Sequence, residues 1–185
     1  MASARDVANF FIDLAVNSEE DSITNLQLNK LLYFSQGHYL ARTGKPLFNE
    51  RIEAWKYGPV IPSIYAAYRA CGEMPIMAVD EDYDPSVFSE EELDLLMDIV
   101  SEYGKYSPSA LVSMTHSSGT PWSEVYIPGA NAVINHEKIR CYFCRDDKKL
   151  KSFGDRLRES KIPTVTSLPV EWYDPAEDAE WEAYL

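Results

Sequence analysis

The sequence lacks the features that mark several large classes of protein. It has three cysteines in 185 residues, an odd and sparse count that excludes a disulfide scaffold. No apolar run approaches the roughly 18 residues that a membrane-spanning helix needs. The first residues, MASARDVANFF, have no apolar core of the kind found in cleavable signal peptides. We therefore predict a cytoplasmic protein without a membrane-bound state.

Basic residues are also scarce. Lysine and arginine number 17 against 30 aspartates and glutamates, so the net charge is −13. A negative field of this size repels phosphate backbones and disfavours nucleic-acid binding. It favours a basic protein partner and fast, salt-sensitive association. The same acidity is equally well explained by solubility alone.

Catalytic signatures are missing as well. The sequence contains no GxSxG elbow, P-loop, HExxH or GxGxxG. Cys141 and Cys144 form a CxxC pair, but a zinc site normally needs four ligands. The remaining candidate ligands are scattered singly along the chain: His38, Cys71, His116 and His136. We expect the two cysteines to fill the core of an apolar helix, without a metal or redox role. The prediction is a non-enzymatic protein with no cofactor.

Helix start and stop signals are frequent, and they predict a single compact, mainly α domain. Capping boxes stand at Ser3/Asp6, Thr24/Gln27 and Ser89/Glu92, and Ser107-Pro108 is a further start. Glycines at 44, 72 and 104 are typical stops. Two stripes are expected to face the core: Val7, Phe10, Phe11 and Leu14, then Leu93, Leu96, Met97 and Val100. Residues 117–121 are predicted to form a turn.

A minor β element is expected near residues 51–57, where the sequence alternates weakly. Trp55, Lys56 and Tyr57 precede Gly58-Pro59, which predicts an abrupt turn flanked by large rings. Rings held on a rigid turn lose little entropy on binding, so they suit an interface. The alternative is that the rings pack the strand onto the preceding helix. We expect one of Trp55 and Tyr57 to be buried and the other exposed.

The composition changes after residue 145. From Arg145 to Lys161 there are seven basic and four acidic residues, and Leu150, Phe153 and Leu157 predict an amphipathic helix with a basic face. Glu171 to Leu185 has six acidic and no basic residues, yet it includes Trp172 and Trp181. We predict a domain of residues 1–145 and a C-terminal arm of residues 146–185. This arm is expected either to select a partner or to dock on its own basic segment.

Several motifs together resemble the Panacea (SocA-like, phage GepA-like) antitoxin domain. They are the segment ITNLQLNKLLYFSQG from Ile23, PLF from Pro46, IEAWKYGPVIPSIY from Ile52, LVSMTH from Leu111 with Pro121-Trp122, and the Ile-x-x-Tyr-Phe of Ile139 to Phe143. They occur in the family's order and cover roughly residues 1–145. Within these motifs and the arm we predict the partner-binding residues: Tyr33, Gln36, Trp55, Lys56, Tyr57, Gly58, Pro59, Tyr65, His116, Trp122, Trp172 and Trp181.

The resemblance implies a function without catalytic residues. It implies a helical antitoxin of bacterial or prophage origin that binds and neutralises a cognate protein toxin. One branch of the family resembles an adaptor that delivers the toxin to the Clp protease, which is a first alternative. A phage-encoded regulatory or host-interaction protein without a toxin partner is a second alternative. An unrecognised hydrolase built around His116 is a third.

Overall fold

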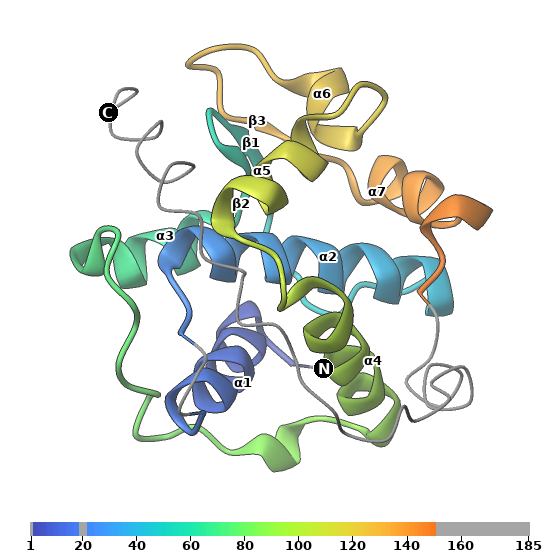
Figure 1. Cartoon of the computed structure of the whole chain (residues 1–185). Helices are drawn as coiled ribbons and strands as arrows, with labels where there is room; N and C mark the ends of the chain where they lie inside the picture. The colour runs from blue at the N-terminus through green and yellow to red at the C-terminus, as the bar shows by residue number, and fades with distance from the viewer. Residues whose placement is uncertain (1, 19–21, 151–185) are drawn as a thin grey trace, which may run out of the picture. The chain divides into compact units, whose positions relative to one another are not determined.

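The computed structural model describes residues 2–18 and 22–150. Within them the fold is mainly α, as predicted, with seven α-helices and one small antiparallel sheet (Figure 1). The elements are α1 Ala4–Val16, α2 Asn25–Thr43, β1 Glu53–Trp55, β2 Gly58–Val60, α3 Pro62–Tyr68, α4 Glu90–Tyr103, α5 Pro108–His116, α6 Pro121–Val125, β3 Ala132–Val133 and α7 His136–Phe143. Short 3-10 turns are η1 Arg69–Cys71, η2 Pro85–Val87 and η3 Asp146–Lys148. None of the described helices is both long and apolar enough to cross a membrane.

Helix α2 is the centre of the fold. It runs through the middle of the molecule and contacts α1, α3, α4, α5, α7 and β2 (Figure 1). Thirteen of its nineteen residues are buried, and they lie on every side of the helix. A helix surrounded in this way must bury its polar side chains, and these then need partners inside the protein.

The helix starts follow the local signals. All three capping boxes form, with each Ser or Thr accepting from the backbone three residues on. Gly44 ends α2 in the left-handed conformation at φ +73°. The two apolar stripes are only partly confirmed. Leu14 and Met97 are exposed, while α4 buries Leu96 as predicted and also buries Leu95 and Ile99.

The sheet is larger than the predicted element. Its strand order is β2-β1-β3, with Trp55 paired to Gly58 and Glu53 paired to both Val60 and Val133. The turn lies at residues 56–57, so Gly58 and Pro59 begin the second strand and do not form the turn itself. Residues 117–120 form the predicted turn, but Pro121 already opens α6. The amphipathic helix predicted from Arg145 to Lys161 is described only as far as residue 150, where η3 is a short 3-10 turn, and Trp172 and Trp181 lie outside the described residues.

Candidate interaction surface

The polar side chains on α2 hold the backbone of the segment that follows β1. Asn29 accepts from the Ile61 amide at 2.9 Å and donates to both oxygens of Asn25 at 2.9 Å. Asn25 in turn donates to the Tyr65 carbonyl at 3.1 Å. Buried amides that satisfy backbone groups rigidify a fold, since removing either partner leaves an unpaired polar atom. Two residues of α2 thus fix the start of α3.

Lys30 holds the hairpin itself. Its side chain is 0 % exposed, and its Nζ donates to the Pro59 carbonyl at 3.0 Å. Burial lowers the pKa of Lys30 from 10.5 to about 7. Gly58 packs against Lys30 and has a φ of +102°. A Cβ at this position would lie 2.8 Å from Lys30 Cε and 2.7 Å from Thr115 Oγ1. Only glycine allows the strand to approach α2 and α5 so closely.

Gln36 performs the same task on the loop before β1. Its Oε1 accepts from the amides of Leu47 and Phe48 at 2.9 and 3.2 Å, and its Nε2 donates to the Phe48 carbonyl at 3.0 Å. The Nε2 also lies 3.2 Å from His136 Nε2 at the start of α7. Gln36 is therefore saturated with internal bonds.

Half-buried and exposed rings surround the clamped hairpin. The rings of Trp55 and Tyr65 meet edge to face at 4.9 Å between centroids, and the Trp55 indole donates to Glu53 Oε2 at 2.8 Å. At the turn, exposed Lys56 lies over the Tyr57 ring at 5.0 Å. The expectation of one buried and one exposed ring is wrong: Trp55 and Tyr57 are both half-buried. Each keeps part of its surface for contact while the rest is packed.

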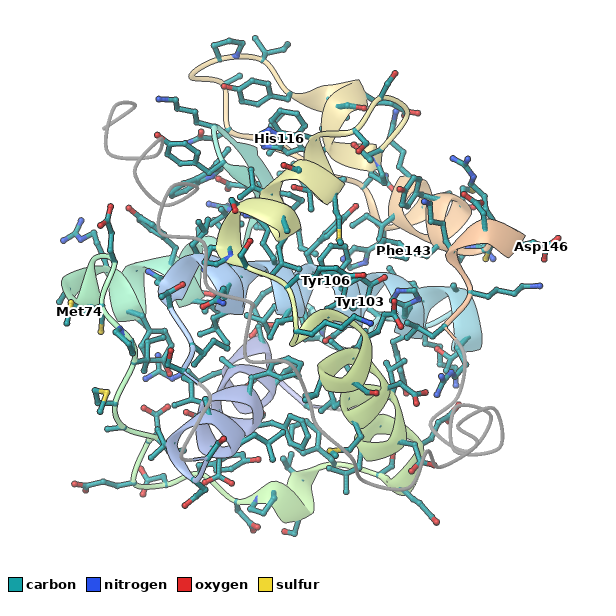
Figure 2. All side chains as sticks on the ribbon, in the orientation of Figure 1. Met74, Tyr103, Tyr106, His116, Phe143 and Asp146 are labelled. Atoms are coloured by element: carbon teal, nitrogen blue, oxygen red, sulfur yellow. The ribbon has the colours of Figure 1, made fainter. Side chains whose placement is uncertain are left out.

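A second group of rings adjoins the first. The Trp122 ring stacks between two other rings. Its centroid lies 3.8 Å from that of His116, with 6° between the ring planes, and 4.4 Å from that of Tyr126, with 18° between the ring planes. Its indole donates to the Trp55 carbonyl at 2.8 Å, which joins the stack to β1. Figure 2 shows His116 in this upper part of the molecule, near α5 and α6. Burial and the nearby Lys30 charge lower the pKa of His116.

We call Trp55, Lys56, Tyr57, Tyr65, His116, Trp122 and Tyr126 the ring surface. The exposed aliphatic side chains of Ile127 and Val133 come from the segment that follows Tyr126 and from β3, which pairs with β1. The apolar area is therefore not confined to the aromatic residues. Trp55 and Tyr57 stand on the hairpin and Tyr65 on α3, and side chains of α2 bond the backbone at Pro59 in β2, at Ile61 just after it and at Tyr65. This is a preorganised surface of the type that protein interfaces use.

The predicted binding residues divide into two groups in the structure. The side chains of Trp55, Lys56, Tyr57, Tyr65 and His116 are at least partly exposed, whereas Tyr33, Gln36, Gly58, Pro59 and Trp122 are buried. Sequence reasoning missed Tyr126 and the two clamps Asn29 and Lys30. The signal for the clamps was a polar pair inside an otherwise apolar helix motif.

The described residues show no arrangement that supports the catalytic alternatives. His116 Nε2 is buried and has no hydrogen-bond partner among the described residues. No group of three or more His, Cys, Asp or Glu side chains within residues 2–18 and 22–150 could hold a metal ion. The prediction that Cys141 and Cys144 fill the core is wrong, because both side chains are exposed. Helix α7 buries Ile139 and Phe143 instead.

Comparison with known proteins connects this architecture to a family. The family model described as "Antitoxin SocA-like, Panacea domain" matches residues 28–123. The curated protein "Antitoxin SocA" of Caulobacter vibrioides (strain NA1000 / CB15N) is 34% identical over 185 residues, which is 95% of this chain and 92% of the relative. The chain belongs to the SocA-like antitoxin family with the Panacea domain. No solved structure matches it.

The residues matched by the family model include most of the ring surface. Residues 28–123 run from α2 into α6, so they hold the clamps Asn29 and Lys30 and all the ring surface except Tyr126. The Panacea domain therefore includes both the helix that clamps and the hairpin that is clamped. The similarity to the Caulobacter relative extends further in both directions, over almost the whole chain.

Proposed function

We propose that this protein is the antitoxin of a toxin–antitoxin pair and that it neutralises a protein toxin by binding it directly through the ring surface. Membership of the SocA-like family supports the antitoxin role. The observation that carries the binding mode is the group of partly exposed rings on and around a hairpin whose Pro59 carbonyl bonds to Lys30 and whose exit at Ile61 bonds to Asn29. Binding in this way requires no chemical step.

Preorganisation is the physical reason for choosing this surface. A toxin that contacts Tyr57 and Tyr65 meets side chains whose backbone is already immobilised, so little entropy is lost on association. Tyrosine and tryptophan are enriched among the residues that dominate interface energies. The net charge of −13 adds long-range attraction for a basic toxin and raises the association rate at low salt. The cationic Lys56 at the turn suits a local carboxylate or carbonyl of the partner.

Co-expression with the product of the adjacent gene tests the role. That product should arrest growth when it is expressed alone, and this protein should restore growth and co-purify with it in a fixed stoichiometry. Failure to rescue growth, with both proteins present, would refute the antitoxin assignment for that pair. Rescue at protein levels far below those of the toxin would point to turnover, and would refute neutralisation by binding.

Single substitutions then test the surface. Tyr65→Ala removes a side chain that is 36% exposed on α3, and alanine is compatible with a helix. It should weaken toxin binding by at least about 2 kcal/mol, which is roughly thirtyfold in Kd. Met97→Ala is the matched control, since Met97 is 45% exposed on α4, outside the ring surface. Equal losses from both variants, or none from Tyr65→Ala and Tyr57→Ala together, would exclude this surface.

Two finer points belong to the proposal. Loss of toxin in cells only when the Clp protease is present would favour the adaptor over the simple blocker.

The division into a domain of residues 1–145 and an arm of residues 146–185 stays a prediction, and so does the role of Trp172 and Trp181. Deletion of residues 171–185 should weaken toxin binding and reduce its salt dependence if the arm selects the partner. Normal binding with a lowered melting temperature would instead assign the arm to the stability of the fold.

A further inference from the structure

Two exposed thiols lie one helical turn apart at the end of α7. Cys141 and Cys144 are both exposed, while Phe143 between them is buried. The Phe143 ring lies so close to Gly37 of α2 that a Cβ on that glycine would be 2.3 Å from it. Figure 2 shows Phe143 between α7 and α2. Because Phe143 packs against α2, the opposite side of α7, which carries Cys141 and Cys144, faces outward.

The spacing suits an intrachain disulfide. In an α-helix the Cα atoms of residues i and i+3 are about 5 Å apart, from the helix rise and radius. Disulfides span Cα separations of roughly 4.4–6.8 Å. The Cβ atoms must approach by about 1 Å more than in a regular helix. Cys144 is the C-cap of α7, where the last turn can tighten toward 3-10 geometry without disturbing the rest of the helix.

Cys141 is accessible to a small polar oxidant. Cys141 lines a surface hollow of about 300 Å³ between α6 and α7. Two basic and two acidic side chains line the same hollow, Lys138 and Arg145 with Glu124 and Glu137, and the Cys141 thiol donates to Glu137 Oε1 at 3.7 Å. Arg140 donates to that carboxylate at 2.8 Å. Cys144 lies outside the hollow, 3.9 Å from the Ala41 carbonyl.

We propose that Cys141 and Cys144 form a reversible redox site that takes a hydroperoxide. The Cys141 sulfur attacks the peroxide O–O bond, giving a sulfenic acid and releasing water or an alcohol, which takes up the thiol proton. The Cys144 sulfur then displaces hydroxide from the sulfenic acid, and hydroxide leaves as water with the second thiol proton. Two thiols are oxidised to one disulfide and one peroxide is reduced, so electrons and atoms balance.

Cys71 is the natural internal comparison. It is half-buried in η1, which follows α3, and α3 and α7 lie at opposite ends of α2 (Figure 1). The site therefore involves the α7 pair alone.

Mass spectrometry of the full chain after brief treatment with hydrogen peroxide tests the proposal. Trypsin cuts after Arg140 and Arg145, so both cysteines fall in one peptide, residues 141–145. That peptide should lose the mass of two hydrogens and regain it with a dithiol reductant, while the Cys71 peptide stays reduced. In Cys144→Ser, Cys141 should accumulate as a sulfenic acid that a dimedone probe traps. In Cys71→Ser the disulfide should form as in the parent chain.

Matched substitutions and the oligomeric state decide the result. Cys141→Ser should abolish the loss of mass, and circular dichroism should confirm that each serine variant is folded. Peroxide treatment that gives only disulfide-linked dimers, or only sulfinic and sulfonic acids, would overturn the proposal. A disulfide that joins Cys71 to either α7 cysteine would overturn it as well.

Discussion

Replacement of Lys30 by methionine should make the protein more stable near neutral pH and change how its stability depends on pH. Methionine fills a similar volume without a charge. Lys30 is fully buried, and its Nζ donates to the Pro59 carbonyl. Replacing a buried charge by an apolar side chain of similar volume is often neutral or stabilising. The lost hydrogen bond works in the opposite direction.

The magnitude follows from the pKa. Burial lowers the pKa of Lys30 from 10.5 to about 7. At about 1.4 kcal/mol per pKa unit, the charged side chain lowers the free energy of unfolding by about 5 kcal/mol at low pH. Losing the donor to Pro59 costs about 1–3 kcal/mol. Lys30→Met should therefore raise the free energy of unfolding by about 2–4 kcal/mol at pH 6.5.

The sign of the pH dependence distinguishes this explanation from simple repacking. Between pH 7 and 10.5 the unfolded chain holds the Lys30 proton and the folded chain does not, so parental stability rises with pH. The destabilisation caused by the buried ammonium has its full value below pH 7 and is absent above pH 10.5. The advantage of Lys30→Met should therefore shrink by about 1.4 kcal/mol for each pH unit above 7.

Urea unfolding at several pH values from 6.5 to 9.5 measures both effects. The difference in stability between the parent chain and Lys30→Met is plotted against pH, which cancels the titration of other groups. Lys56→Met is the control, since Lys56 is exposed on the hairpin turn. Curves for parent and Lys30→Met that run parallel from pH 7 to 9.5 would refute the reasoning, because a buried lysine with a depressed pKa must separate them.

The remaining predictions concern glycine, asparagine and histidine positions. Gly58→Ala should lower the free energy of unfolding by at least about 2 kcal/mol in urea denaturation, because φ is +102° and a Cβ would meet side chains at 2.7–2.8 Å; a neutral effect would contradict so close a contact between the hairpin and α2. Gly37→Ala should cost about 1–3 kcal/mol, and Phe143→Leu should recover part of that cost, whereas additive losses would contradict direct contact. Asn29→Ala should cost about 1–3 kcal/mol and speed hydrogen exchange at the Ile61 amide. Burial lowers the pKa of His38 to about 3, so stability should fall as pH drops below 6.5, and less steeply in His38→Gln.

Most of the helical framework could be predicted from the sequence, because its signals act over three or four residues. Ser3 and Asp6 satisfy each other's backbone whatever surrounds them, and Gly44 takes a left-handed conformation that other residues avoid. Strand β3 could not be predicted. Its two residues carry no pattern, and they become a strand only by pairing with β1.

Most residues of the ring surface could be named from the sequence, but Tyr126 and the supporting side chains of α2 could not. Its aromatic motif is visible in the sequence around Trp55, and so is the membership of the family. The sequence alone could not say that Trp55 and Tyr57 would both be half-buried, because their burial depends on neighbours from α3 and from the rest of the sheet. The role of Lys30 was hidden for the same reason. A lysine pKa near 7 requires an environment that several distant segments create together.

The sequence by itself determined where helices begin and end, the acidic charge and the aromatic hairpin motif, since each depends on composition or on near neighbours. Tertiary structure alone decided which side of each helix is covered. In α7 the close fit of Phe143 against Gly37 turns Cys141 and Cys144 outward, and in α2 enclosure by neighbours turns polar side chains into clamps. Burial is a property of the assembled chain, because the surface that a side chain loses is supplied by residues far away in the sequence.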